Sequence, residues 1–181
     1  MRRLYRILYR VGFTPWDSAE VPGPVRAAAD RTPGRAVDLG CGTGAQARFL
    51  AEHGWAVTAV DFVASAVAAA RAADAQGGVE WRVGDVTDVS TVDPDGRLRA
   101  AVDLVLDNGC LHGLADADRP AWAGTVDALA APGATLLVRA APRRRRGVGP
   151  QGLDGAELRR LIGDGWDEYP TEPGWYHFRR P

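Results

Sequence analysis

The sequence predicts an α/β fold, with a mostly parallel sheet covered by helices on both faces. Short apolar runs with the composition of buried strands alternate with helical segments from about residue 36 to residue 139. The connections between them are short, as expected when each helix crosses over between parallel strands. A chain of 181 residues can bury one full core. We therefore expect a single domain.

The individual elements follow from apolar patterning and from turn residues. Strands are expected at 36–39, 55–60, 79–83, 101–106 and 134–139. Helices are expected at 45–53, 63–73, 116–131 and 154–162, the third capped by Asp116 and stopped by Pro132-Gly133. Two aromatic runs, 166–169 and 175–178, flank a proline- and glycine-containing turn and predict a terminal antiparallel pair.

Residues 1–34 precede this sheet and are expected to form an N-terminal helix and lid segment packed on the core at 35–181, within a single domain overall; a membrane-surface helix is the alternative. Apolar residues at helical spacing predict a surface helix near the N-terminus, with arginines on its other side. They are Leu4, Ile7, Leu8 and Val11.

Composition narrows the classes of partner. The 22 basic and 23 acidic residues give a net charge of -1, which provides no overall attraction to nucleic acid. No run of eighteen apolar residues predicts a membrane span, and the basic N-terminus lacks the apolar core of a secretory signal. The two cysteines, Cys41 and Cys110, make neither a disulfide framework nor a zinc pattern. We expect a cytoplasmic protein without a metal, as a monomer or homodimer.

The stretch VDLGCGTG at 37–44 predicts a strand that turns tightly into a helix. Gly40, Gly42 and Gly44 alternate along it, with Cys41 inside the turn. Glycine tolerates positive φ and carries no Cβ, so a nucleotide-like ligand can lie against the main chain.

Four acids follow or end the predicted strands. Asp61 lies 21 residues after Gly40 and ends the second strand, where a carboxylate can accept hydrogen bonds from both ribose hydroxyls. Asp38, Asp85 and Asp107 lie near the ends of other strands. Ligands of open parallel sheets bind at the carboxyl ends of the strands, so we expect these acids to meet at the binding edge.

Two nucleotide ligands fit the glycine turn. With Ala45 the turn satisfies G-x-G-x-x-[G/A], which is compatible with an NAD(P)-dependent oxidoreductase. However, Gly44 comes one position early, Asp38 would repel a pyrophosphate, and Asp85 adds a further acid. An adenosine ligand with a positive sulfonium and no phosphate suits such an edge better. A non-catalytic cofactor-binding or regulatory domain is a third alternative.

At residues 35–140 the chain resembles the class I S-adenosylmethionine-dependent methyltransferases. The resemblance rests on the motifs VDLGCGTG, VTAVD, VGDV, DLVLDNG and PGATLLV. It implies a Rossmann-like sheet of seven strands with an antiparallel last strand. It also implies methyl transfer from S-adenosylmethionine to a small-molecule acceptor by in-line displacement, giving S-adenosylhomocysteine.

The resemblance assigns roles to the residues that match its motifs. The turn residues would line the cofactor, with Asp38 ordering the turn and the methionine end. Asp61 and the adjacent Phe62 would hold the ribose. Asp85 and Val86 would hold the adenine. Asp107 and Asn108 would face the methionine or methyl side.

A looser resemblance links the chain to small bacterial methyltransferases related to the thiol, halide and thiopurine group. It rests on FTPWD, DLVLDNGCLHGL and GPQGLDGAELRR. Trp16 and Asp17 match that group's Pro-Trp-Asp segment, which closes over the cofactor, so Trp16 is implied to contact it. Ser18 follows where a glycine is expected.

The acceptor side is expected to involve His112, Asp107 and Arg143. His112 follows the fourth strand and is either a hydrogen-bonded residue of the pocket wall or a general base. As a base, it would be oriented by Asp107. A base is needed only if the acceptor must lose a proton. Cys110 is expected to be a small apolar filler. The run Arg143–Arg146 is either a solvated loop or a gate for an anionic acceptor.

Overall fold

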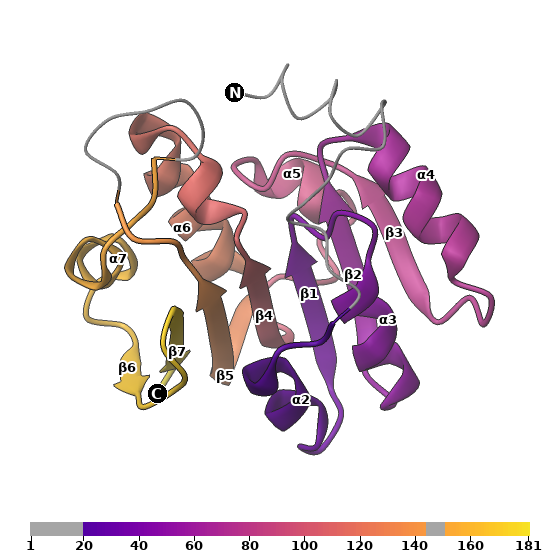
Figure 1. Ribbon diagram of the computed structural model, residues 1–181, viewed down its shortest axis with the longest axis horizontal. Coiled ribbons are helices and arrows are strands. Elements are labelled where there is room, and N and C mark those ends of the chain that lie inside the picture. The colour runs from indigo at the N-terminus through magenta and orange to yellow at the C-terminus, as the bar shows by residue number, and fades with distance from the viewer. Residues whose placement is uncertain (1–19, 144–150) are drawn as a thin grey trace.

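The computed structural model describes residues 20–143 and 151–181. Its seven-stranded sheet has the order β3-β2-β1-β4-β5-β7-β6 (Figure 1). The pairs among β1 to β5 are parallel, whereas β7 runs antiparallel to both β5 and β6. The predicted seven-stranded sheet with an antiparallel last strand is confirmed.

The parallel strands form the centre of the molecule because their side chains are apolar on both faces. They are β1 (Arg35–Leu39), β2 (Ala56–Asp61), β3 (Val79–Val83), β4 (Val102–Asn108) and β5 (Ala130–Arg139). Successive residues point to opposite faces, so Leu104 and Leu106 join one apolar cluster while Val105 joins the other. Both faces therefore need a layer of helices.

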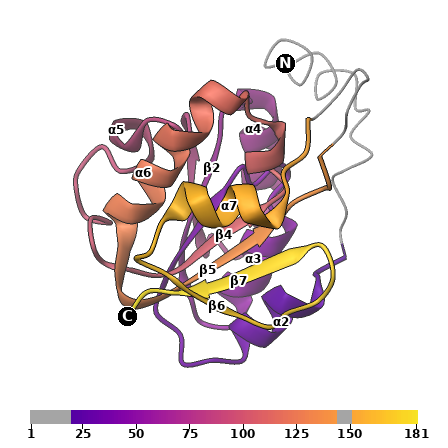
Figure 2. The same ribbon diagram turned by 90° about the vertical axis from the view of Figure 1, so that its left-hand side faces the viewer.

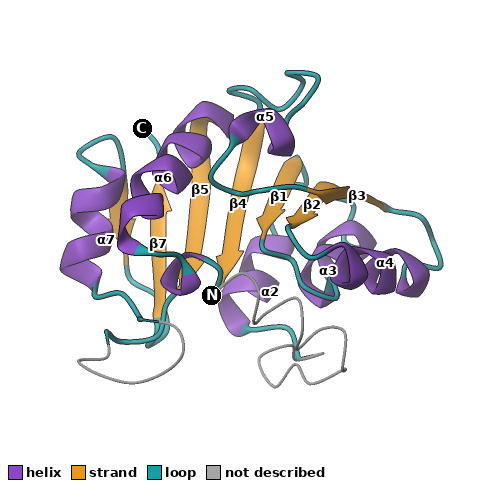
Figure 3. Cartoon of the chain, turned by 90° about the horizontal axis from the view of Figure 1, so that it is seen from above, coloured by secondary structure: helices purple, strands orange, loops and turns teal. Residues whose placement is uncertain are grey.

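Helices of the described ranges cover both faces of the sheet (Figure 3). On one side lie α2 (Gly23–Ala29), α3 (Ala45–Glu52) and α4 (Ala64–Ala73). On the other lie α5 (Val89–Val92), α6 (Arg119–Leu129) and α7 (Gly155–Ile162). In the described ranges no helix is long and apolar enough to cross a membrane.

The terminal hairpin is also confirmed. β6 (Asp167–Tyr169) pairs with β7 (Trp175–Arg179), and β7 adds to β5. The register places Phe178 opposite Leu136, and both side chains are buried in the same cluster. The aromatic residues of β7 thus extend the core toward one edge of the sheet.

Three local predictions about elements were wrong or incomplete. α6 begins at Arg119, after a 3-10 turn at Asp116–Asp118, and the Asp116 side chain pairs with arginines instead of capping. β5 already begins at Ala130, so Pro132 and Gly133 lie within it, at an irregularity in the pairing with β4. The short helix α5 was not predicted.

The helix α2 was also not predicted, although Pro24 in its first turn and the following alanines are typical of a helix start. It buries Val25 and Ala28 in the same cluster as Ala36 of β1. The predicted surface helix around Leu4–Val11 lies outside the described residues, and the division at residue 34 stays a prediction.

The glycine turn between β1 and α3 is shaped by its neighbours. Gly40, Gly42 and Gly44 all have positive φ, at 79°, 54° and 79°. A Cβ on Gly44 would lie 2.2 Å from the Trp81 ring. Trp81 is itself held by its indole N–H, which donates to Asp74 at 3.0 Å. The third glycine is therefore required by packing as well as by backbone conformation.

Gly44→Ala tests this packing. We expect it to lower the free energy of unfolding by about 3 kcal/mol, since a strained φ and a clash with Trp81 add together. Gly133→Ala is the matched control, because Gly133 has φ 78° and nothing within 4 Å of its Cβ position. The control should lose only about 1 kcal/mol. Urea denaturation followed by circular dichroism measures both; equal losses would show that Trp81 makes room.

Candidate functional site

The carboxyl end of β2 holds the glycine turn in place. The amides of Gly40 and Cys41 donate to the Val60 carbonyl at 2.8 and 3.0 Å. The Asp61 carboxylate accepts from the Gly42 amide at 3.0 Å and from the Val63 amide at 2.8 Å. Asp61 thus accepts hydrogen bonds both from the turn and from the start of α4.

The four predicted acids meet at this edge, around Cys110. Burial raises the pKa of the Cys110 thiol, and the negative charges of Asp107, Asp61, Asp38 and Asp85 raise it further. Each acid lies in the last two positions of its strand or within two residues after it. The predicted convergence at one edge is therefore present, and it creates a strongly acidic environment.

Cys110 also explains the first glycine of the turn. A Cβ on Gly40 would lie 2.4 Å from the Cys110 Cβ and 2.7 Å from its sulfur. Cys110 is half-buried and packs against one apolar cluster, as expected of a filler residue, while Cys41 is buried in the cluster on the other face. At Gly40 the missing Cβ thus makes room for the loop that follows β4.

Asp85 follows the end of β3 and is hydrogen-bonded to residues close to it in the chain. Asp85 Oδ1 accepts from the Thr87 amide at 3.0 Å and from the Thr87 hydroxyl at 2.7 Å. The Asp85 amide donates to the Thr91 hydroxyl at 2.8 Å. Val86 is buried in the core, and Phe62 is half-buried beside Asp61. The position is as predicted, and the adenine contacts of Asp85 and Val86 stay a prediction.

Asp107 has a structural task that the sequence did not indicate. Its carboxylate is fully buried and accepts hydrogen bonds from the amides of Gly109, Cys110 and Leu111, at 2.8 to 3.1 Å. Burial raises its pKa to about 7, and these amides oppose the shift. Asp107 therefore orders the loop after β4, and in the part of the chain that the structure describes it makes no hydrogen bond to His112.

Asn108, next in the chain, provides an observation about ligand binding. Its side-chain Oδ1 is buried and, among the described residues, has no hydrogen-bond donor. A buried acceptor without a partner is costly, and it is satisfied when a ligand or water donates to it. The amino group of a methionine moiety is such a donor, so the acidic edge fits S-adenosylmethionine.

His112 lies between the loops that follow β4 and β5. Its Nδ1 accepts from the Ala141 amide at 3.2 Å, and its ring packs across Gly109. Burial lowers the pKa of the imidazole, a hydrogen bond to the Arg139 backbone opposes this shift, and the charges of Arg139 and Arg119 lower the pKa further. With Nδ1 accepting from Ala141, we assign the ring proton to Nε2.

Arg143 belongs to a group of four charges that also joins these loops. It pairs with Asp116 and, at 3.0 Å, with Glu157 of α7. Arg119 pairs with the same two acids, at 3.1 and 2.5 Å, and donates to the Gly152 carbonyl at 2.8 Å. Two cations and two anions thus balance, so the charge of Arg143 is already matched.

Arg119 is the member of this group that sequence reasoning missed. It is only 2% exposed, although arginine is rarely buried. The spacing Asp116-x-x-Arg119 is a signal for a helical ion pair, but burial of the guanidinium depends on α7 and residue 152, which are distant in sequence. The group therefore arises only from tertiary packing.

Arg119→Met tests whether this group stabilises the loops. We expect a loss of about 3 kcal/mol in the free energy of unfolding, because Glu157 and the Gly152 carbonyl lose a buried donor. Arg159→Met, which removes an exposed ion pair with Glu168, is the control and should change stability little. Thermal and urea denaturation measure both. Equal small losses would mean that the buried pairs do not hold the loops.

Two other predicted features lie outside the described residues, namely Trp16 with its lid segment and Arg144–Arg146. Within the described ranges, no group of three side chains is suited to hold a metal ion.

Comparison with known proteins identifies the family. A model of the methyltransferase domain matches residues 37–136, more than half of the chain. Over 82 residues, or 44% of its length, the chain is 37% identical to ribosomal RNA small subunit methyltransferase C of Alcanivorax borkumensis. This match spans 23% of that relative, so the chain corresponds to less than a quarter of it.

Solved structures share the fold at low identity. The 1,6-didemethyltoxoflavin-N1-methyltransferase of Burkholderia thailandensis, solved with S-adenosylhomocysteine, has a TM-score of 0.78 and 22% identity over 99% of this chain and 86% of that one. The N-methyltransferase NodS of Bradyrhizobium japonicum, also with S-adenosylhomocysteine, has a TM-score of 0.66 and 20% identity over 82% and 78%. Because the family model covers more than half of the chain, the chain belongs to the methyltransferase-domain family, and its fold is that of the class I S-adenosylmethionine-dependent methyltransferases.

Proposed function

We propose that the protein transfers a methyl group to a small-molecule acceptor bound between the loops that follow β4 and β5. The observation that supports this most is the convergence of four acids and the donor-less Asn108 oxygen at the carboxyl edge of the sheet. The acceptor would approach from the side of His112 and Ala141, next to that edge. A cytoplasmic location is proposed with it, since no disulfide joins Cys41 and Cys110.

The residues of the edge would divide the cofactor between them. Asp61 would accept from the ribose hydroxyls in addition to the turn amides. Asp85 and Val86 would contact the adenine. Asp38 and the Asn108 oxygen would receive the donors of the methionine end. When bound, S-adenosylmethionine supplies a methyl group on a sulfonium, already activated for displacement.

His112 would position the acceptor as a hydrogen-bond donor. Its Nδ1 is occupied by the Ala141 amide, which leaves Nε2–H to meet an acceptor oxygen or nitrogen. A base needs a free lone pair, and this tautomer does not present one on Nε2. Methyl transfer to an acceptor that is nucleophilic without losing a proton agrees with this arrangement.

The contacts of Arg143 do not support an anionic gate. Its guanidinium is paired with Asp116 and Glu157, so an anionic acceptor would have to displace a carboxylate. We therefore propose a neutral or weakly polar acceptor.

An RNA acceptor is the second candidate function. It is favoured by the 37% identity to a ribosomal RNA methyltransferase, although the match is confined to 82 residues. Against it, the near balance of basic and acidic residues gives the protein no net positive charge to attract a phosphate backbone. The two proposals can be distinguished by which acceptor, a small molecule or RNA, causes S-adenosylmethionine to be converted to S-adenosylhomocysteine.

Calorimetric titration tests the cofactor assignment. The protein should bind S-adenosylmethionine and S-adenosylhomocysteine but not NAD. Asp61→Asn should weaken this binding about tenfold or more, because a charged hydrogen-bond acceptor is lost. Asp30→Ala removes an exposed acid far from the edge and should leave affinity unchanged. Tighter binding of NAD, or equal affinities for the two variants, would contradict the assignment.

An acceptor screen tests the proposed function itself. We expect S-adenosylhomocysteine formation with members of a panel of thiols, phenols, amines and nitrogen heterocycles, and none with ribosomal RNA. Turnover on RNA alone would replace the small-molecule proposal by the RNA one. Intact cofactor binding without turnover on either would favour a non-catalytic domain.

With an acceptor from that screen, His112→Asn separates a donor from a base. Asparagine keeps an N–H donor, so we expect KM for the acceptor to rise about tenfold with little change in kcat. His112→Phe should raise KM further. A fall in kcat of two orders of magnitude or more for both variants, together with loss of a limb of the pH profile, would instead identify His112 as a general base.

A further inference from the structure

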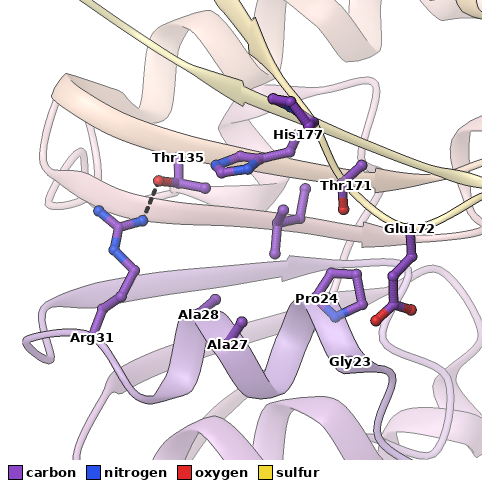
Figure 4. A pocket seen from close by; sticks show the side chains of 11 residues that line it. Gly23, Pro24, Ala27, Ala28, Arg31, Thr135, Thr171, Glu172 and His177 are labelled. Atoms are coloured by element: carbon purple, nitrogen blue, oxygen red, sulfur yellow. Dashed lines mark hydrogen bonds between the residues drawn. The ribbon is translucent and has the colours of Figure 1, made fainter.

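A cavity of about 490 Å³ lies away from the acidic edge, between α2 and the sheet (Figure 4). α2 provides one wall, Thr135 and Leu137 of β5 and His177 of β7 provide the other, and the connection between β6 and β7 closes one end. Figure 2 shows α2 beneath these strands. The lining includes none of the residues assigned to the cofactor or acceptor.

One end of the cavity is cationic. The Arg31 guanidinium donates to the Thr135 hydroxyl, and no carboxylate among the described residues lies within ion-pair distance of it. Its remaining N–H groups can take a carboxylate in a two-pronged contact. The charge at this end is therefore unmatched within the described part of the chain.

His177 adds a second polar group near Arg31. Its Nε2 is buried and has no hydrogen-bond partner among the described residues. Burial lowers the pKa of the ring, and the charges of Arg31 and Arg179 lower it further, so the imidazole is neutral. A polar group of a ligand could supply the hydrogen-bond partner that this nitrogen lacks among the described residues.

The opposite end of the cavity is anionic. Glu172 lies there, next to Thr171, and Figure 4 shows it at the far side from Arg31. Its carboxylate approaches Gly23 so closely that a Cβ on Gly23 would lie 2.1 Å from Oε1. In the described ranges Glu172 has no basic partner within ion-pair distance. The absence of a side chain at Gly23 makes room for this carboxylate at the start of α2.

Between the two ends the lining is apolar. Pro24, Ala27, Ala28 and Leu137 form this part. α2 is about 9 Å long from Gly23 to Ala29 at 1.5 Å per residue, and Arg31 follows just beyond its end. The cavity thus offers a cation, an apolar stretch and a carboxylate in line, within the volume range of small-molecule sites.

From this order of charges we propose that the cavity binds a small amphoteric molecule, with a carboxylate toward Arg31 and Thr135, an apolar chain along α2, and an amine toward Glu172. Such a ligand would bring an opposite charge to each end of the cavity at once. The site is separate from the proposed methyl-transfer site and does not depend on it.

Three probes of equal chain length test the proposal: 6-aminohexanoate, hexanoate and hexylamine. The full-length protein is titrated with each, and amide chemical shifts are followed by nuclear magnetic resonance. We expect 6-aminohexanoate to bind about fivefold more tightly than either single-charge probe. The shifts should be largest at Ala27, Ala28, Thr135 and His177.

Charge-removing variants assign each end. Arg31→Gln should abolish the advantage of 6-aminohexanoate over hexylamine, and Glu172→Gln its advantage over hexanoate. Arg26→Gln, on an exposed side chain of α2 that does not line the cavity, is the control. Binding of S-adenosylmethionine should be unchanged in all three variants, which shows that they fold.

Several outcomes would overturn the proposal. They are equal affinities for the three probes, shifts confined to residues outside the cavity, and no shift up to tens of millimolar. Unchanged selectivity in Arg31→Gln and Glu172→Gln would do the same. None of these results bears on the methyl-transfer site, so failure here and failure of the proposed function are distinguishable.

Discussion

The candidate site depends on the attachment of the glycine turn to the carboxyl end of β2. The Val60 carbonyl and the Asp61 carboxylate together take four backbone amides, from Gly40, Cys41, Gly42 and Val63. These bonds hold the turn in a positive-φ conformation and also start α4. A carboxylate offers about four acceptor sites, so we propose that the same group both anchors the turn and binds the cofactor.

The acceptor side is organised by a second, independent set of contacts. Asp107 gathers the amides that follow β4, and this loop carries His112 to the amide of Ala141 after β5. The four charges centred on the buried Arg119 then tie the start of α6 to α7. Buried ion pairs are valuable for geometry more than for net stability. In this arrangement Arg143 is paired with Asp116 and Glu157. We therefore interpret Arg143 as a residue that links loops and not as a gate for an anionic acceptor.

Most of the fold could be predicted because its signals are local. Buried parallel strands have continuous apolar runs, helices have caps and stops, and the aromatic pair flanks a proline-glycine turn, so each element is visible within about ten residues. The errors lie where local signals conflict. Pro132 and Gly133 are typical helix stops, yet the pairing of Ala130 with Val102 already places them in a strand. Asp116 is a typical cap, but two arginines compete for its carboxylate.

The sequence by itself determined the α/β class, the family and the set of acids at the sheet edge, because motif spacing and strand polarity dictate which residues reach that edge. Only the tertiary structure decided what each side chain does there. In the folded chain, Asp107 is a buried acceptor for the amides of its own loop, and His112 Nδ1 accepts from Ala141. Cys110 packs against Gly40, and Trp81 packs against Gly44. The tertiary structure also created the Arg119 group and the cavity beside α2. Each of these joins segments far apart in the chain, and their contacts depend on packing distances that no local pattern records.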